Sequence, residues 1–379
     1  MLPAPKSDAL SLADVLESCL GAIAGGPNRL GLPGVERAVV VVVDGLGADA
    51  LKARAGHSRT LAGALTVKSV IESGFPTTTA SAIATITTGV RPGQHGLVGY
   101  SVLDADHDRV VNQLSGWDDR LDPATWQSVP TLFERAVAGG YSAIAIGPAR
   151  YRETGFSHAV LRGARYVAAA SIAERMSRAA EWLREPGPPG LAYVYVPELD
   201  SAAHAHGGDS REWTAALEAT DAAARDFVAA LGRRDGLIVT ADHGVLDIPQ
   251  HSHLLFDTVP GLVEGVRFVA GEPRCLQLHF EPDATAAQRE RIVSAWRASE
   301  SDRAWVATRD EAIAADWFGP VRAEVLPRIG DLLIAARKNV AYYDSRAGVQ
   351  GQSMIGQHGS WSPAELRVPL LRFGAFAAA

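Results

Sequence analysis

The feature that most constrains the fold of this chain is a series of short, unbroken apolar runs rich in valine, isoleucine and leucine. The runs that we expect to form strands are AVVVVVD (38–44), YSAIAIG (141–147), LAYVYVP (191–197), GLIVTADHG (236–244), DLLIAA (331–336) and RVPLLRFG (367–374). An unbroken apolar run of about four to eight residues suits a strand that is covered on both faces, as the strands of a parallel sheet are. The sequence therefore predicts several buried, parallel strands.

Helical patterns lie between these runs. They are expected at TLFERAVAGG (131–140), ASIAERMSRAAEWLRE (170–185) and SREWTAALEATDAAARDFVAALG (210–232). Strands that alternate with helices predict an α/β fold, a doubly wound and mostly parallel sheet flanked by helices. We expect residues 1–379 to form a single domain of this kind. A smaller α+β subdomain is expected as an insertion at about 265–343, where VRFVAGEPRCLQLHF precedes a helical AAQRERIVSAWRAS.

Composition and charge argue against several classes of protein. The chain carries 36 Lys and Arg against 43 Asp and Glu, a formal net charge of −7, which is unfavourable for a surface that coats nucleic acid. Its two cysteines, Cys19 and Cys275, exclude a disulfide scaffold and a thiolate-rich metal site. The first residues show no signal-peptide pattern, and no apolar run approaches the length of a membrane span. We therefore expect a cytoplasmic protein with no membrane segment and no nucleic-acid-binding surface.

Polar residues gather at the expected strand ends. Ligands of open α/β sheets bind outside the carboxyl ends of the strands, so side chains at these ends can share one pocket. Three aspartates and three histidines from distant parts of the chain fall there: Asp44, Asp200, His204, Asp242, His243 and His358. Taken singly, a strand-end aspartate is often a helix N-cap, and a histidine is more often a hydrogen-bonded core or surface residue. The joint occurrence of all six predicts a metal-binding pocket.

The types of ligand indicate which metal the pocket binds and how many ions it holds. Carboxylate and imidazole ligands without thiolate suit zinc, and less specifically manganese or iron. Six protein ligands are too many for one catalytic zinc ion, which normally keeps one position open. Two divalent ions with about three ligands each are the natural division, and such a pair clamps the attacking and leaving oxygens of an in-line phosphoryl transfer.

The segment GFPTTTASAIATITTGVRPGQHG (74–96) offers a nucleophile. Three threonines, Thr77, Thr78 and Thr79, precede a stretch rich in alanine and isoleucine that can form a helix. A hydroxyl at a helix N-terminus lies where backbone N–H groups and the helix dipole favour phosphate. A threonine here can equally be only the cap of the helix. The chemistry alone leaves the choice among the three open.

In their order along the chain, these motifs resemble the alkaline phosphatase superfamily, and most closely its type I phosphodiesterase/nucleotide pyrophosphatase family. The matching pieces run from about Val39 to Pro369 and are VVVVVDGLGADAL, PTTTASAIATITTGVRPGQHG, PELDSAAHAHG, TADHG and QHGSWSP. Five motifs in the family's order make the resemblance far more specific than a single motif would. The resemblance implies an alkaline phosphatase-like fold.

The resemblance also implies roles for individual residues. One zinc ion would be held by Asp200, His204 and His358, and the other by Asp44, Asp242 and His243. Thr79 falls at the position of the family's nucleophile, which implies that it binds the second ion and attacks phosphorus. The product of that step would be a phosphothreonine, which water then hydrolyses.

Two departures from the family pattern bear on the substrate. The family places an asparagine shortly after the HG turn, where it helps to hold a phosphoryl oxygen, whereas this sequence has Tyr100 near that position. We treat Tyr100 as a weaker substrate-binding candidate, since a phenol donates one hydrogen bond with a different reach. Thr79 is followed by Ala80, Ser81 and Ala82 in place of the family's usual Phe-Pro-Asn. The family's aromatic nucleotide-stacking pocket therefore cannot be carried over directly.

The resemblance and the ligand set together predict a metal-dependent hydrolase of phosphoric esters. Its substrate would be a small diester or pyrophosphate, for example a nucleotide. A phosphomonoesterase or phosphonate hydrolase of the same superfamily is the nearest alternative, and a monoesterase would need a cation such as Arg91, Arg150 or Arg152 for the extra charge. A metal-binding protein without catalysis is disfavoured, because binding alone does not require Thr79.

Overall fold

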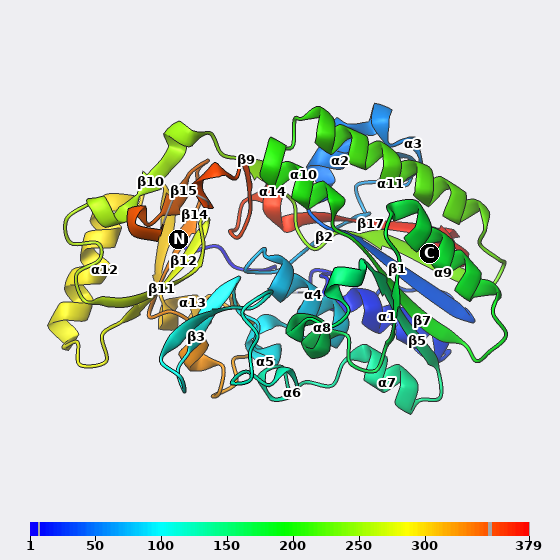
Figure 1. The fold of residues 1–379 in the computed structure, drawn as a ribbon, viewed down its shortest axis with the longest axis horizontal. Coiled ribbons are helices and arrows are strands. Elements are labelled where there is room, and N and C mark those ends of the chain that lie inside the picture. The colour runs from blue at the N-terminus through cyan, green and yellow to red at the C-terminus, as the bar shows by residue number, and fades with distance from the viewer. Residues whose placement is uncertain (7, 348–350, 379) are drawn as a thin grey trace.

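A seven-stranded, mostly parallel sheet forms the centre of the structure, a computed structural model that describes residues 1–6, 8–347 and 351–378 (Figure 1). The strand order is β2-β17-β8-β1-β7-β5-β6. The strands are β1 (Arg37–Val43), β2 (Val70–Glu72), β5 (Ser142–Gly147), β6 (Arg165–Ala168), β7 (Gly190–Val196), β8 (Asp235–Thr240) and β17 (Arg367–Gly374). The five from β8 to β6 in this order are parallel. Every residue of the valine-rich β1 is buried, as a strand covered on both faces requires. The predicted α/β fold class is confirmed.

Two of the expected parallel strands are not parallel. The run at 367–374 is β17, which lies antiparallel to β8, and the short β2 pairs antiparallel with β17 in turn. The run at 331–336 contains β14 (Leu332–Ala336), which belongs to a separate antiparallel sheet. The prediction of parallel strands is therefore wrong for both. An unbroken apolar run signals burial, which β14 shows throughout and β17 over most of its length, but it carries no information on strand direction.

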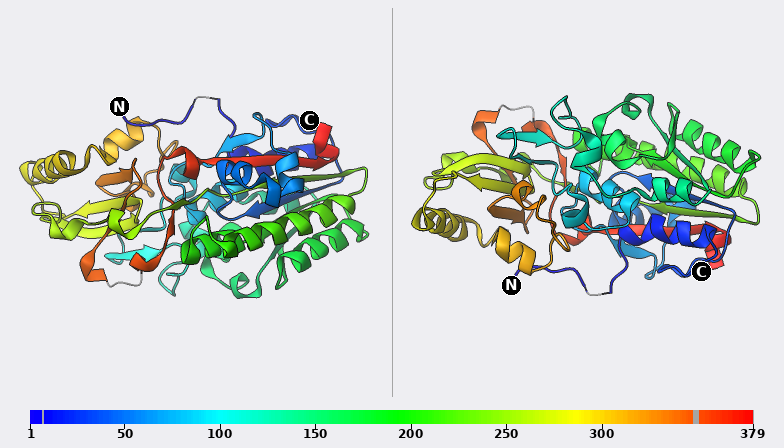
Figure 2. Two further views of the ribbon diagram at one scale, coloured as in Figure 1. Left: turned by 90° about the horizontal axis from the view of Figure 1, so that it is seen from above. Right: turned by 90° about the horizontal axis from the view of Figure 1, so that it is seen from below.

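Helices cover both faces of the seven-stranded sheet (Figure 2). On one face α9 (Ile172–Arg184), α10 (Glu198–His206) and α11 (Arg211–Ala229) pack together, and on the other α1 (Ala13–Ile23), α4 (Thr79–Thr88) and α7 (Leu132–Ala138) do so. Ser171 and Ser210 cap α9 and α11 by accepting hydrogen bonds from backbone N–H groups of the first turn. The predicted helices thus form, although α11 ends three residues before Gly232.

Shorter helices connect these layers. They are α2 (Ala48–Ala53), α3 (Arg59–Gly63), α5 (Pro92–His95), α6 (Pro123–Trp126), α8 (Gly155–Val160), α13 (Arg309–Ala314) and α14 (Pro363–Leu366). The described residues also form three two-stranded ladders: β3 (Ser101–Asp104) with β4 (Arg109–Asn112), β9 (Leu246–Asp247) with β16 (Gly356–Gln357), and β10 (His253–Leu255) with β15 (Ala341–Tyr343). Within the described ranges, no helix combines the length and the apolar character that crossing a membrane requires.

A second, four-stranded antiparallel sheet lies beside the first, at the left of Figure 1. Its order is β11 (Val266–Glu272), β12 (Cys275–Phe280), β14 and β13 (Ala304–Thr308). Helix α12 (Ala286–Glu300) contributes Trp296, which is fully buried, to the apolar cluster on this sheet. These elements fall within the 265–343 region of the expected insertion. The division of the chain into a main domain and an inserted subdomain stays a prediction.

A buried ion pair connects the second sheet to the segment that leads into β17. Arg274, in the turn between β11 and β12, donates to the carboxylate of Glu365 in α14 from Nε at 2.7 Å and from Nη2 at 2.9 Å. Both side chains are fully buried. The guanidinium also donates to the backbone carbonyls of Lys338 and Val340 at 2.9 and 2.8 Å. Because the pair is buried, removing one partner leaves the other charge without compensation.

We expect the substitution Arg274→Ala to lower the free energy of unfolding by about 3–5 kcal/mol, since it leaves the Glu365 carboxylate buried and unpaired. Urea unfolding followed by tryptophan fluorescence measures the change. Arg297→Ala is the matched control, because the pair of Arg297 with Glu311 is about 40% exposed on each side and should contribute less than about 1 kcal/mol. Equal, small losses in the two variants would contradict the prediction.

Candidate functional site

The candidate site lies at the carboxyl ends of three neighbouring strands. Strands β8, β1 and β7 are adjacent in the middle of the seven-stranded sheet. Asp44 directly follows β1, and Asp242 and His243 follow β8 after one residue. Asp200 lies in the first turn of α10, which begins shortly after β7. Since parallel strands end at the same edge, the topology alone brings these four residues together.

The turn after β1 requires glycine. Gly45 adopts φ +76°, and a Cβ there would lie only 3.1 Å from the backbone of Asp200. Its N–H donates to Asp242 Oδ1 at 3.1 Å, and the N–H of His243 donates to the same oxygen at 2.9 Å. Two backbone groups thus hold one oxygen of Asp242 and leave Oδ2 facing the site.

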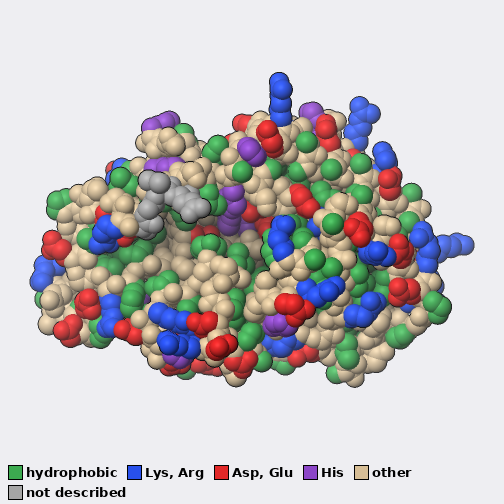
Figure 3. Space-filling view, viewed as in Figure 1, with side chains coloured by type: hydrophobic (Ala, Val, Ile, Leu, Met, Phe, Trp, Pro, Cys, Tyr) green, Lys and Arg blue, Asp and Glu red, His purple; other side chains and the backbone are tan. Residues whose placement is uncertain are grey.

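The two remaining histidines complete the set. Asp200 and His204 are one turn apart on α10, with His204 Nε2 at 3.2 Å from Asp200 Oδ2. His358 arrives from near the end of the chain, just after β16, and its ring stacks on that of His243 with centroids 3.7 Å apart. Its Nε2 lies 3.8 Å from Asp200 Oδ1. Figure 3 shows histidine and acidic side chains in the hollow between the parts of the molecule built on the two sheets.

The six residues form two groups, each with ligand atoms mutually within 4.8 Å: Asp200, His204 and His358 in one, and Asp44, Asp242 and His243 in the other. Each aspartate has one buried oxygen without a hydrogen-bond partner among the described residues, namely Asp44 Oδ1, Asp200 Oδ1 and Asp242 Oδ2. A buried carboxylate oxygen without a partner is costly unless a cation compensates it. The donor set and these three oxygens therefore fit two divalent cations.

Electrostatics in this pocket also favour a cation. Burial raises the pKa of Asp44 well above its ordinary value, and the charges of Asp242 and Asp200 raise it further. Burial opposes ionisation of Asp200 too, yet the hydrogen bond and charge of His204 bring its pKa below the ordinary value. The pKa of His358 is lowered well below its ordinary value by burial and by the neighbouring His243. A neutral imidazole is the form that binds metal, and a cation can take the place of the proton on Asp44.

The three threonines of the sequence analysis are separated by the geometry. Thr79 is the first residue of α4, and its Oγ1 lies 3.1 Å from His243 Nε2. Thr77 Oγ1 instead donates to the carbonyl of Ser360 at 2.8 Å and accepts from the N–H of Gly359 at 3.0 Å. Thr78 is the N-cap residue of α4 and is fully buried. Only Thr79 among these three has a hydrogen bond to one of the six candidate ligands through its side chain in the described structure.

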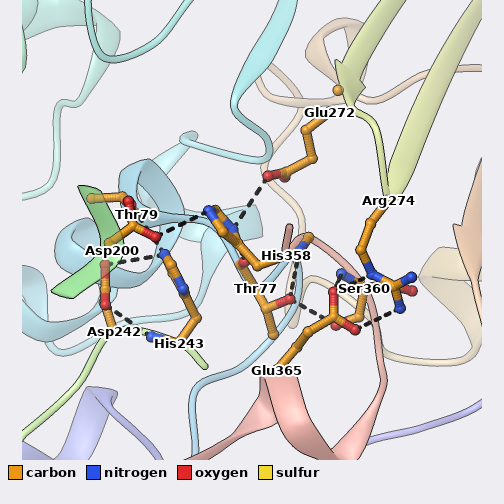
Figure 4. A network of polar contacts seen from close by, with 12 residues as sticks. Thr77, Thr79, Asp200, Asp242, His243, Glu272, Arg274, His358, Ser360 and Glu365 are labelled. Atoms are coloured by element: carbon orange, nitrogen blue, oxygen red, sulfur yellow. Dashed lines mark hydrogen bonds and ion pairs between the residues drawn. The ribbon is translucent and has the colours of Figure 1, made fainter. Parts of the chain in front are cut away.

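Figure 4 shows how the segment of His358 is held in place. His358 Nδ1 donates to the carbonyl of Thr77 at 2.8 Å, which leaves Nε2 facing the site. Glu272, from the end of β11 in the second sheet, brings Oε2 to 3.6 Å from the same Nδ1. Ser360 Oγ donates to the carbonyl of Ala336 at 2.6 Å. The loop that carries His358 is therefore fixed between the loop before α4 and the second sheet.

Two side chains beside the ligands were missed by the sequence analysis. The hydroxyl of Tyr195 in β7 donates to Asp44 Oδ2, and Glu272 lies next to His358. For Tyr195 a signal existed, because a tyrosine in a buried strand five residues before Asp200 needs a partner for its hydroxyl. For Glu272 there was none, since only the docking of the second sheet brings it to the site.

A cavity of about 100 Å³ lies beside Thr79. Its walls include Ile83 of α4, Tyr151, Phe156 of α8, Tyr166 of β6, and Tyr193 and Tyr195 of β7. No charged residue is found among the described residues that line it. An apolar, aromatic recess next to a candidate nucleophile is suited to an uncharged, flat group carried by the substrate.

The weaker candidates occupy different positions. Tyr100 is 39% exposed and is absent from the described lining of the cavity, so its substrate-binding role stays a prediction. Arg91 pairs with Asp316 at 2.6 Å. Arg150 lies with its guanidinium 4.7 Å from the ring centroid of Tyr151, and its Nη2 donates to the Tyr151 hydroxyl at 3.1 Å. Arg152 has its guanidinium 5.9 Å from the ring centroid of Tyr166, so Arg150 and Arg152 each lie beside a tyrosine of the cavity wall.

Comparisons with known proteins bear on the family and the fold of this chain. A family model described as "Type I phosphodiesterase / nucleotide pyrophosphatase" matches residues 38–361. A Schizosaccharomyces pombe protein described as an uncharacterised pyrophosphatase/phosphodiesterase is 27% identical over 181 residues, or 45% of this chain. The aligned part spans only 36% of that relative's length.

Solved structures share the fold. Murine ectonucleotide pyrophosphatase/phosphodiesterase 5 superposes with a TM-score of 0.68 at 16% identity, covering 89% of this chain and 88% of its own. The human protein of the same name gives a TM-score of 0.67 at 16% identity, over 89% and 87% of the two chains. An inactive variant of the murine protein, solved in complex with AMP, gives 0.67 at 16% identity over 89% and 88%.

We expect zinc to raise the melting temperature of the protein relative to a sample in EDTA, because a cation would compensate the three unpartnered aspartate oxygens. With free zinc at about 100 times its Kd, each site adds about 2.7 kcal/mol of stability. Differential scanning fluorimetry measures the shift. His358→Ala should reduce it, whereas the exposed His57→Ala should not. Identical melting temperatures of the wild type in zinc and in EDTA would rule out the metal centre.

Proposed function

Because the chain belongs to the type I phosphodiesterase/nucleotide pyrophosphatase family over residues 38–361, we propose that it hydrolyses phosphoric diesters or pyrophosphates with Thr79 as its nucleophile. The observation that carries the proposal is the position of Thr79. Its hydroxyl stands at the start of α4, 3.1 Å from His243 Nε2 and beside the Asp44–Asp242–His243 group. A hydroxyl nucleophile, a helix N-terminus and two candidate metal sites together suit phosphoryl transfer.

Two divalent ions would complete the site. One would be held by Asp200, His204 and His358, and the other by Asp44, Asp242 and His243. We propose zinc foremost, with manganese or iron as alternatives, because half of the ligands are imidazoles and none is a thiolate. When bound, such ions lower the pKa of a nearby hydroxyl and offset the negative charge of the phosphoryl oxygens.

The proposed reaction has two successive displacements at phosphorus. Thr79 Oγ1 attacks phosphorus in line as its proton passes to solvent, and the bond between phosphorus and the leaving oxygen breaks. The leaving alcohol or phosphate takes up a proton from solvent, and a phosphothreonine that still carries the retained group forms. Water attacks the same phosphorus in the second step, which restores the threonine hydroxyl and releases the phosphorylated product. Backbone N–H groups in the first turn of α4 have no partner within the helix and lie ready to hold a phosphoryl oxygen.

The cavity beside Thr79 suggests which group on phosphorus is recognised. Its walls of four tyrosines and Phe156 suit a nucleobase or another uncharged ring. A structural neighbour was solved with AMP, which supports a nucleotide diester or pyrophosphate as the substrate. Stacking here would come from Tyr151, Phe156 or Tyr166 rather than from the residue after Thr79, which is Ala80.

A phosphomonoesterase or phosphonate hydrolase is the second candidate. The observation in its favour is Arg150, whose guanidinium lies over Tyr151 at the wall of the cavity. A cation in this position can meet the additional charge of a monoester. The relative rates on diesters and monoesters decide between the two functions.

We expect the zinc-loaded protein to hydrolyse bis-p-nitrophenyl phosphate at least about tenfold faster than p-nitrophenyl phosphate. Thr79→Ala should lower kcat by about a thousandfold or more, because no other side chain replaces the nucleophile. Release of p-nitrophenol measures both rates. Thr78→Val is the matched control, since Thr78 precedes Thr79 and its hydroxyl has no hydrogen bond to a candidate ligand among the residues that the structure describes.

The opposite substrate preference would favour the second candidate while keeping Thr79 as nucleophile. Full activity of Thr79→Ala would remove the proposed mechanism altogether. Loss of activity in Thr78→Val equal to that in Thr79→Ala would show that the start of α4, rather than one hydroxyl, was damaged.

Phe156→Trp should raise KM for an aryl diester of thymidine 5′-phosphate by roughly tenfold, because the larger ring fills part of a cavity of about 100 Å³. Steady-state kinetics at saturating zinc measure the change. The zinc-dependent melting shift serves as the control and should stay at its wild-type value. An unchanged KM would show that the substrate does not enter the cavity.

A further inference from the structure

We infer that Tyr195 is a positioning residue for the Asp44–Asp242–His243 metal site, whose hydroxyl turns Asp44 so that one oxygen faces the ion. The inference rests on the proposed function, because it concerns the same site. It adds a side chain that neither the sequence motifs nor the comparisons single out. Tyr195 touches both the proposed metal site and the cavity beside Thr79.

The two carboxylate oxygens of Asp44 have different surroundings. The Tyr195 hydroxyl donates to Oδ2. Oδ1 is buried and lies 3.4 Å from His243 Nε2, and no residue that the structure describes forms a hydrogen bond with it. A carboxylate held through one oxygen presents the other in a fixed direction. Tyr195 thus determines which oxygen of Asp44 is available as a ligand.

The other candidate ligands show why this contact matters. Asp242 is held by two backbone N–H groups, and the Nδ1 atoms of His204, His243 and His358 lie 2.7, 3.2 and 2.8 Å from backbone carbonyl oxygens. Backbone groups therefore orient four of the six. Asp44 is instead oriented by a side-chain hydroxyl, so a single substitution can remove that support without altering the backbone.

The ring of Tyr195 is itself held in place. Tyr193, two residues earlier on the same face of β7, lies nearly parallel to it with centroids 6.4 Å apart. Tyr151 meets it edge-on at 5.9 Å. A donor fixed by two neighbouring rings loses little conformational freedom when its hydrogen bond forms, which is the property required of a group that orients a metal ligand.

The test is the substitution Tyr195→Phe, which removes one oxygen atom and keeps the ring. Zinc affinity is measured by competition with a chromophoric chelator. We expect two zinc sites in the wild type, and in Tyr195→Phe a loss of about tenfold or more in affinity at one of them, with the other unchanged. Tyr166→Phe is the matched control, because Tyr166 lines the same cavity but donates to the carbonyl of Pro148 at 2.8 Å.

A second readout separates positioning from general damage. If Tyr195 acts through the metal site, excess zinc should return kcat of Tyr195→Phe to near the wild-type value. In an Asp44→Asn background, Tyr195→Phe should cause no further loss of zinc affinity, because its target is already gone. If Tyr195→Phe alone folds poorly, the comparison of Asp44→Asn with the double variant still tests whether Tyr195 acts through Asp44.

The outcomes are distinguishable. Two wild-type zinc sites that keep their affinity in Tyr195→Phe would overturn the inference and leave the proposed function intact. A further loss in the Asp44→Asn background would likewise overturn it, because the effect would not pass through Asp44. Absence of zinc binding by the wild type would instead overturn the metal centre and the proposed function with it.

Discussion

Three aspartate carboxylates gathered in one buried pocket are the constraint on which the rest of this structure depends. Burial and mutual repulsion raise the pKa of Asp44, and each of the three carries an oxygen that has no hydrogen-bond partner in the described part of the chain. Such a cluster is costly in a folded chain unless a ligand compensates it. The adjacency of β8, β1 and β7 creates the cluster, and α4 adds a helix start and a hydroxyl beside it. The carboxylate cluster therefore lowers the stability of the folded protein at the same position where catalysis is proposed to occur.

Apolar runs and short residue spacings were enough to predict part of the fold and of the site. Asp44 and Asp242 come directly after apolar runs, so the general rule about strand ends sufficed to place them in one pocket. Asp200 and His204 needed only the spacing of one helical turn. Strand direction was not predictable for β14 and β17, because pairing partners distant in sequence decide it and apolar runs of either direction look alike.

Tertiary contacts explain what was missed. Glu272 reaches His358 only because the second sheet docks against the loop after β16. The family resemblance pointed to Thr79, but the residue chemistry alone left Thr77 open, and only the structure shows that Ser360 and Gly359 occupy the hydroxyl of Thr77. Thr77 therefore joins the loop before α4 to the loop that carries His358. The two segments are about 280 residues apart in sequence, and no local pattern relates them.

The spread of the ligands along the chain has a consequence for how the protein is made. The first candidate ligand is residue 44 and the last is residue 358, so a chain leaving the ribosome exposes five of the six before the sixth has been synthesised. Contacts of such long range form late in folding. Until His358 docks, the group containing Asp200 and His204 lacks its third member. A partly synthesised chain therefore could not hold both of the proposed ions, and we expect activity only after His358 has been translated and packed.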